Sequence, residues 1–339
     1  MTSKSHELFV EEIFIKPEEN KPVVKIVKKT TPSLKERGLS PKAIMEKAKK
    51  VENDEFYTLY EDVEKEISMY DKSIWKDKTV FCNCDDAIDN DDNRKNSAFA
   101  LYFRKHFKEL GLKKLICTHY AGKVDLFNQG SKAYVAYISC TTDGEKIYKD
   151  YPKGYDGSFD HPLSLKILHE EADIVCTNPP FSRAIDYWEI IVKSGKKFII
   201  VSNIANPVTK AYIPYFKNSR VWAGYNRVDY FLNPKRQLTD AAGHWYTNIP
   251  IENRPKYELL KIMPLKDIPE KYKKYDDSKT LLVDNCYIPN NIKKPFAVSA
   301  RPILNGVLEK EYKIIEENES YIAVVNGKEC FRRVLVQKT

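Results

Sequence analysis

The order of apolar segments in this 339-residue chain predicts an α/β fold, built on a mostly parallel sheet with helices on both faces. Short β-branched runs alternate with segments of helical periodicity between residues 79 and 224. With 42% apolar residues, the chain can bury one large core and a smaller one beside it. From residue 227 onward, prolines interrupt the pattern, which indicates a separate, irregular region.

The expected strands are short apolar runs bounded by polar or turn-forming residues, at residues 79–84, 114–118, 173–177, 197–202 and 220–224. The expected helices have apolar residues at spacings of three and four, and they cover residues 61–70, 97–110, 162–171 and 182–193, with a short helix after Thr209. Ligands of parallel sheets bind at the carboxyl ends of the strands, so the residues that follow the strands are expected to share one cleft. These are residues 83–86, 118–120, 178–181 and 202–203.

Three regions are expected along the chain. Residues 1–40 are rich in lysine and proline and predict a flexible basic arm, whose lysines serve either solubility or contact with nucleic-acid phosphates. Residues 41–226 form the catalytic domain, with a helix that starts near Pro41. Residues 227–339 form a recognition region that ends in a β-hairpin around Asn326-Gly327, because this dipeptide favours a tight turn. The alternative for the last region is a packing extension that only covers the sheet.

Composition excludes several classes of protein. No apolar run approaches the roughly 20 residues that span a bilayer, and the polar N-terminus lacks a secretory segment, so we expect a cytoplasmic protein without membrane contact. The seven cysteines are odd in number and mostly lie in apolar runs, which favours reduced thiols over disulfides. Cys82 and Cys84 have no second pair at zinc spacing, and no metal site is expected. The net charge of +8 is compatible with a polyanionic partner.

The most informative motif follows the strand at residues 173–177 and consists of Asn178, Pro179, Pro180 and Phe181. Two prolines make this loop rigid and extended, so the Asn178 amide and the Pro179 carbonyl can converge as hydrogen-bond acceptors beside the Phe181 ring. This arrangement suits a planar heterocycle that is held by its exocyclic amino group. Holding both amino hydrogens localises the nitrogen lone pair for attack on an electrophilic methyl group, so no strong base is needed. The alternative is that the prolines only form a stiff turn.

Several segments of the chain resemble the EcoRI-type adenine-specific DNA methyltransferases. They are residues 53–58, 82–86, 110–114 and 172–182, and the similarity is continuous from about residue 54 to residue 225. The resemblance implies a Rossmann-like fold and an activity that depends on S-adenosyl-L-methionine. It also implies an enzyme that flips an adenine out of duplex DNA and methylates its N6 nitrogen, in a restriction-modification system or in phage or host DNA protection.

The same resemblance assigns roles to individual residues. Asn178 and the Pro179 carbonyl would hold the amino group, with Phe181 stacked on the flipped base. The cofactor would be bound by a segment before the first strand, by the loop after that strand, and by one aromatic ring. The residues concerned are Asp54, Phe56, Tyr57 and Thr58, then Asn83, Cys84, Asp85 and Asp86, and finally Phe159.

The chain departs from the common cofactor-binding pattern in two places. The glycines that usually follow the first strand are replaced by residues 83–86, in agreement with the EcoRI type. The acidic residue that usually follows the second strand is replaced by residues 118–120, which leaves the ribose-binding acid unassigned. The acidic stretch that starts at Asp89 superficially resembles a calcium loop. Its sixth position is Arg94 and its twelfth is Ala100, so no calcium site is expected.

We therefore expect a monomeric enzyme that binds double-stranded DNA, with any cognate restriction endonuclease a separate protein. Two alternatives remain open. The same loop serves amino-methyltransferases that act on RNA or on protein glutamine, and a relative without catalysis could retain the fold as a DNA-binding protein. The recognition sequence cannot be read from the chain, because base contacts depend on the placement of side chains in three dimensions.

Overall fold

The computed structural model describes residues 6–10, 26–30, 56–87, 97–121, 132–142, 144–218, 220–233, 237–250, 260–284, 286–315 and 320–339. In the basic arm, β1 (His6–Val10) and β2 (Ile26–Thr30) form an antiparallel pair that the sequence analysis did not predict. The helix expected near Pro41 and the acidic stretch at residues 89–94 lie outside the described residues.

An eight-stranded sheet forms the centre of the molecule, with the strand order β6-β5-β4-β3-β7-β8-β10-β9. The four central strands are parallel, and they are β3 (Thr79–Cys82), β4 (Lys114–His119), β7 (Ile174–Thr177) and β8 (Lys197–Asn203). Antiparallel hairpins flank them, formed by β5 (Tyr134–Thr141) with β6 (Gly144–Asp150) and by β9 (Trp222–Leu232) with β10 (Leu238–Thr247). The expected parallel arrangement therefore holds at the centre only, and the sheet as a whole is mixed.

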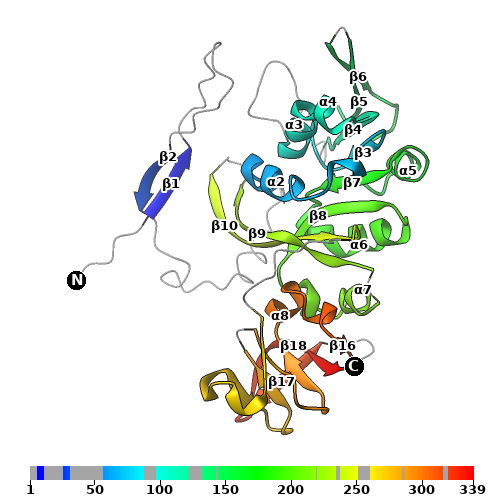
Figure 1. Cartoon of the computed structure of the whole chain (residues 1–339). Helices are drawn as coiled ribbons and strands as arrows, with labels where there is room; N and C mark the ends of the chain where they lie inside the picture. Colours follow the sequence, from blue (N-terminus) through cyan, green and yellow to red (C-terminus); the bar gives the residue numbers. More distant parts are fainter. Residues whose placement is uncertain are drawn as a thin grey trace.

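Helices cover both faces of this sheet, as expected (Figure 1). One face packs against α2 (Tyr60–Ile67), α3 (Ala98–Lys105) and α4 (Phe107–Leu110). The other packs against α5 (Pro162–Lys166), the π-helical turn that continues it (Ile167–Glu171), α6 (Ala184–Lys193) and α7 (Ile213–Lys217). Successive strand residues alternate between the two cores, with Val80 in the first and Phe81 in the second. The central strands are thus apolar on both faces, which explains their uninterrupted apolar runs.

The boundary expected after residue 226 falls inside β9. The β9–β10 hairpin completes the large sheet, because β10 pairs with β8 from Gly243 opposite Asn203 to Thr247 opposite Ile199. The sheet unit therefore extends to Thr247. Since β10 runs antiparallel to β8, residues 238–242 and the end of β9 extend past the carboxyl end of β8. The described ends of the two strands, at Leu232 and Leu238, therefore lie at the edge of the sheet where ligands are expected.

The C-terminal part holds a smaller sheet where an irregular region was expected. In sheet order its strands are β12 (Lys273–Tyr275), β13 (Leu281–Val283), β15 (Phe296–Val298), β18 (Lys328–Lys338) and β16 (Tyr312–Ile314), and β17 (Tyr321–Val325) pairs with β18. A separate parallel pair is formed by β11 (Lys261–Met263) and β14 (Tyr287–Pro289). The expected final hairpin is confirmed. Asn326 and Gly327 have φ values of +53° and +71°, as its tight turn requires.

The two parts share one continuous core. The short helix α8 (Ala300–Leu304) lies between β15 and β16 of the smaller sheet and contacts a 3₁₀ turn (Asn206–Val208) that follows β8. Ile303 of the helix and Val208 of the turn belong to the same buried cluster. The C-terminal part is therefore packed firmly onto the large sheet.

Three further observations concern membrane spans, the cysteines and metal sites. Within the described ranges, no helix is both long enough and apolar enough to cross a membrane. All seven cysteines are free, and Cys82, Cys117, Cys176 and Cys286 are buried. Among the residues that the structure describes, no group of three or more His, Cys, Asp and Glu side chains could hold a metal ion.

Candidate active site

The strand order reverses at the centre of the large sheet. From β3 the chain continues outward to β4 and β5 on one side, and it then returns to β7 and β8 on the other. Such a reversal opens a crevice at the carboxyl ends of the two central strands. The loops that follow β3 and β7, residues 83–86 and 178–181, meet at this edge, and a hydrogen bond from Thr177 to Asp85 joins them.

The side-chain amide of Asn178 is held in one orientation. Its Nδ2 donates a hydrogen bond of 2.7 Å to the main-chain carbonyl oxygen of Phe56. Its Oδ1 is buried and has no hydrogen-bond partner among the described residues. A buried acceptor without a partner is costly, so it indicates a group that a ligand completes. Because the donor end of the amide is already engaged, the acceptor end is the one presented to that ligand.

The Phe181 ring belongs to a cluster of three phenylalanines. Its centroid lies 5.7 Å from that of Phe56 and 5.3 Å from that of Phe231, both in edge-to-face geometry. Phe231 comes from β9, next to the hairpin tip, and the sequence analysis did not single it out. In the sequence, Phe231 is only an aromatic residue within a short apolar stretch, and ordinary core residues have the same surroundings. The cluster fixes the half-buried Phe181 ring beside Asn178.

The segment before α2 contacts both β9 and the loop at residues 178–181, in which we expect the catalytic residues. Tyr57 forms a two-way main-chain bridge with Leu232, with N–H to carbonyl distances of 2.8 and 2.9 Å. The neighbouring Thr58 is buried, and its Oγ1 has no hydrogen-bond partner among the described residues. Phe56, Tyr57 and Thr58 thus border the crevice. Asp54 lies outside the described residues.

Asp85 is a buried carboxylate that joins three elements. One oxygen accepts a hydrogen bond of 2.5 Å from Thr177, the last residue of β7, and the other accepts from Ser97, which caps α3. Burial raises the pKa of Asp85 to about 7, while these two hydrogen bonds act in the opposite direction. Both carboxylate oxygens are used inside the protein, so Asp85 shapes the crevice rather than facing it.

Two other predicted residues of this loop also point to internal partners. The Oδ1 of Asn83 accepts a hydrogen bond of 2.7 Å from the hydroxyl of Tyr187, in α6. Burial raises the pKa of the Cys84 thiol, which keeps it protonated and makes it a poor nucleophile. The Asn83 side chain therefore fixes the loop against α6, whereas Cys84 is partly exposed beside it.

Asp86 is the loop residue whose carboxylate reaches across the edge of the sheet. It is hydrogen-bonded to Nδ1 of His119, at the end of β4. The His119 ring stacks on Tyr134 of β5, with centroids 5.1 Å apart and planes at 20°. The sequence lacks an acidic residue after β4, and the fold brings one to the same place from the loop after β3.

Phe159 lies at the same edge and is almost fully buried. Its ring meets Tyr187 edge-to-face at 5.1 Å, and the Arg183 guanidinium lies 4.6 Å from its centroid. Arg183, which follows the catalytic loop, also bonds Asp160 at 2.6 Å. Gly157 approaches β4 so closely that a Cβ there would lie 1.9 Å from the carbonyl oxygen of His119. These contacts join the segment around Phe159 to both the catalytic loop and the end of β4.

The fold thus gathers at one edge the predicted site residues that lie within the described ranges. The sequence analysis missed the residues that hold them there, which are Ser97, Thr177, Arg183, Tyr187 and Phe231. Thr177 lies in a segment that the resemblance covers, but nothing local in the sequence indicates the contacts that these five residues make.

The profile of the adenine-specific methyltransferase EcoRI family matches residues 44–338 of the chain. The Type II methyltransferase M.MgeORF184P of Mycoplasma genitalium is 30% identical over 332 residues, which cover 86% of this chain and 98% of that protein. Over shorter stretches, M.EcoRI of Escherichia coli is 35% identical over 187 residues, and M.MpnI of Mycoplasma pneumoniae is 34% identical over 179 residues. Each stretch covers 53% of this chain, and they cover 55% and 50% of those two proteins. No solved structure matches the chain significantly.

The matched range extends the similarity from residue 225, where the sequence analysis placed its end, to residue 338. It therefore includes both the large sheet with its crevice and the smaller C-terminal sheet. The chain belongs to the EcoRI family of adenine-specific methyltransferases.

Proposed function

We propose that this protein is a site-specific DNA methyltransferase that modifies the N6 amino group of an adenine flipped out of duplex DNA. The observation that carries the proposal is the anchored amide of Asn178. Its Nδ2 is bound to Phe56 at 2.7 Å, and its buried Oδ1 has no partner among the described residues. This is the geometry of a hydrogen-bond acceptor prepared for an amino group.

The chemistry of the catalytic loop follows from these contacts. Asn178 Oδ1 and the Pro179 carbonyl accept the two hydrogens of the amino group, which localises the nitrogen lone pair for attack. Because the acceptors are held in place before the substrate arrives, little reorganisation is needed during the reaction. Phe181, fixed by Phe56 and Phe231, supplies a ring on which the flipped base stacks. No residue is required to act as a strong base, since the amino group becomes acidic as it is methylated and loses its proton to water.

The residues around the crevice fit S-adenosyl-L-methionine, which supplies the methyl group when bound. Thr58 Oγ1 is a second buried polar atom without a partner among the described residues, and it lies in the segment expected at the methionine end. Asp86, held by His119, offers a carboxylate for the ribose hydroxyls. Phe159 offers an apolar contact for the adenine ring, with Arg183 on its face.

The strand order supports a Rossmann-like methyltransferase fold for the large sheet. We propose a catalytic unit from residue 41 to Thr247 and a DNA-recognition unit from residue 260 to the C-terminus, preceded by the basic arm at residues 1–40. We propose that the enzyme works as a monomer on double-stranded DNA in the cytoplasm. Any cognate restriction endonuclease would act separately.

The test is to express the chain in cells that lack adenine methylation and to sequence the modified bases in their DNA. We expect N6-methyladenine at one short recurring sequence, and a much smaller methylated fraction at that sequence with an Asn178→Ala variant. Parallel assays of the purified protein with S-adenosyl-L-methionine offer duplex DNA, RNA and glutamine-containing peptides as substrates. Methylation of RNA or peptide alone, or binding of DNA without methylation of any substrate, would refute the proposal.

A further inference from the structure

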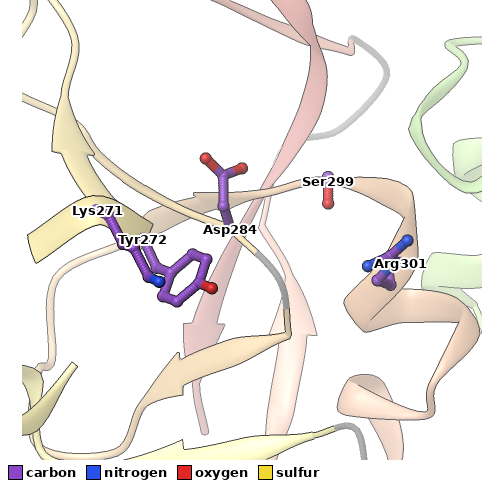
Figure 2. A pocket seen from close by; sticks show the side chains of 5 residues that line it. All are labelled: Lys271, Tyr272, Asp284, Ser299 and Arg301. Atoms are coloured by element: carbon purple, nitrogen blue, oxygen red, sulfur yellow. The ribbon is translucent and has the colours of Figure 1, made fainter. Parts of the chain in front are cut away.

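A pocket with a volume of about 460 Å³ lies in the C-terminal part, well outside the crevice of the large sheet. It is lined by Lys271, Tyr272, Asp284, Ser299 and Arg301 (Figure 2). A volume of this size falls within the range of roughly 300 to 1,000 Å³ that small-molecule sites occupy, so it can take a nucleotide-sized group.

The balance of charge in this pocket is positive. Lys271 comes from a 3₁₀ turn (Glu270–Tyr272) and Arg301 from α8, both are exposed, and they lie on opposite sides of the pocket in Figure 2. Asp284, the one acidic lining residue, is 2.7 Å from the guanidinium of the buried Arg333. Arg333 also donates to the Val283 carbonyl at 3.1 Å, which fixes its position. Two of the five lining residues are therefore cationic, and the acidic one is paired with Arg333.

The wall that carries Lys271 is a stack of tyrosines and lysines. The rings of Tyr272 and Tyr287 lie 4.7 Å apart at 19°. Lys271 lies 4.9 Å from the centre of the Tyr272 ring, and Lys261 lies 5.1 Å from that of Tyr287. This stack holds Lys271 in place at the pocket, and its cation suits a phosphate. Ser299 adds a hydroxyl donor.

We propose that this pocket binds the sugar-phosphate backbone of one DNA strand and so positions the duplex on the enzyme; this inference rests on the proposed function. A phosphodiester carries a negative charge and accepts hydrogen bonds without donating any, which matches two cations and a hydroxyl. The gold segment that precedes β13 and the strand β10 both lie toward the left of the view in Figure 1, and β10 extends past the carboxyl end of β8 at the crevice. Contacts of this kind set the register of DNA on a protein and carry no sequence information.

The test compares Lys271→Gln, Arg301→Gln and the double variant with the parent chain. The matched control is Lys108→Gln, which removes an exposed lysine from α4, outside the pocket. Two fluorescent duplexes of equal length serve as probes, one with the sequence that the parent methylates in cells and one unrelated. Anisotropy gives their affinities over a salt series.

Each pocket substitution is expected to weaken binding to both duplexes by the same factor, several-fold at about 0.1 M salt. It should lower the slope of log affinity against log salt by about 0.9, and the double variant by about twice that value. The Lys108→Gln control should bind like the parent. Lys271→Arg and Arg301→Lys should keep the parental slope, because they keep the charge. In methylation assays the KM for DNA should rise more than kcat falls.

Two results would overturn the inference. An unchanged affinity and slope in the double variant would show that the pocket does not meet DNA, and a loss confined to the methylated sequence would assign it to base reading. Failure of the proposed function can be distinguished from both results, because the parent chain itself would then methylate no DNA.

Discussion

Thr177 and Asp85 form a hydrogen bond of 2.5 Å although 92 positions separate them in the chain. Thr177 directly precedes Asn178, and Asp85 lies in the loop after β3. Because the second oxygen of Asp85 accepts from Ser97, one buried carboxylate fixes the end of β7, the loop after β3 and the start of α3. The position of the catalytic loop therefore depends on residues that no motif connects to it.

The first prediction concerns Asn178→Ala, which removes the acceptor for the amino group and the anchor to Phe56. Loss of one positioned polar group that acts in the transition state costs on the order of 3 kcal/mol, so kcat should fall about a hundredfold or more. Single-turnover methylation measures this, and calorimetry should find S-adenosyl-L-methionine affinity nearly unchanged. Asn178→Asp keeps an acceptor but sets a carboxylate oxygen against the Phe56 carbonyl, so its rate should lie between the two. A rate for the alanine variant within a few-fold of the parent would exclude the assigned role.

The second prediction separates positioning from stability at Asp85. Thr177→Val and Ser97→Ala each remove one donor to the same buried carboxylate, so each should lower the free energy of unfolding by about 1–3 kcal/mol. Only Thr177→Val disturbs the residue next to Asn178, and it alone should also lower kcat, by roughly tenfold. Urea denaturation and turnover measurements on both variants provide the comparison. Equal effects on kcat would contradict a specific link between Thr177 and the catalytic loop.

The third prediction concerns pH. The folded-state pKa of Asp85 is raised to about 7, above the unfolded value near 4, so the folded protein binds the proton more tightly. The stability that Asp85 contributes is therefore complete below about pH 4 and is lost as the pH rises through about 7. Relative to Asp85→Asn, the parent should lose at most about 1.4 kcal/mol of unfolding free energy per pH unit in this window. Urea denaturation of both proteins between pH 4 and pH 8 measures the difference, and a constant difference would refute the prediction.

The fourth prediction uses two glycines with similar backbones. Gly157 and Gly154 have φ values of +83° and +78°, so alanine is strained at both positions, by roughly 1 kcal/mol. At Gly157 the new Cβ would also lie 1.9 Å from the His119 carbonyl, whereas at Gly154 nothing lies within 4 Å. Gly157→Ala should displace the end of β4 and weaken S-adenosyl-L-methionine binding about tenfold or more. Gly154→Ala should lower only the stability of the fold. Similar losses of cofactor affinity in both variants would contradict a role for the contact between Gly157 and His119 in cofactor binding.

Local sequence determined the class of fold and the central motif. The strands β3, β4, β7 and β8 are apolar on both faces, so each is visible in the sequence as a short continuous apolar run. The amphipathic helices between them have apolar residues at spacings of three and four. The catalytic loop was equally visible, because two adjacent prolines after a strand restrict their own backbone and that of Asn178. The turn at Asn326 and Gly327 was predictable for the same reason, since both residues tolerate a left-handed backbone.

Only the tertiary structure decided how these parts meet. The anchor of Asn178 lies 122 positions away at Phe56, the ring beside Phe181 comes from β9, and the acid beside His119 comes from the loop after β3. The β9–β10 hairpin joined the large sheet although its connection contains Pro234, because strand pairing depends on the register of distant main-chain groups. A sequence pattern records the preference of each segment for its own conformation. The orientation of an amide, the pKa of Asp85 and the charge balance of the C-terminal pocket arise from contacts between segments, and these exist only after the chain has folded.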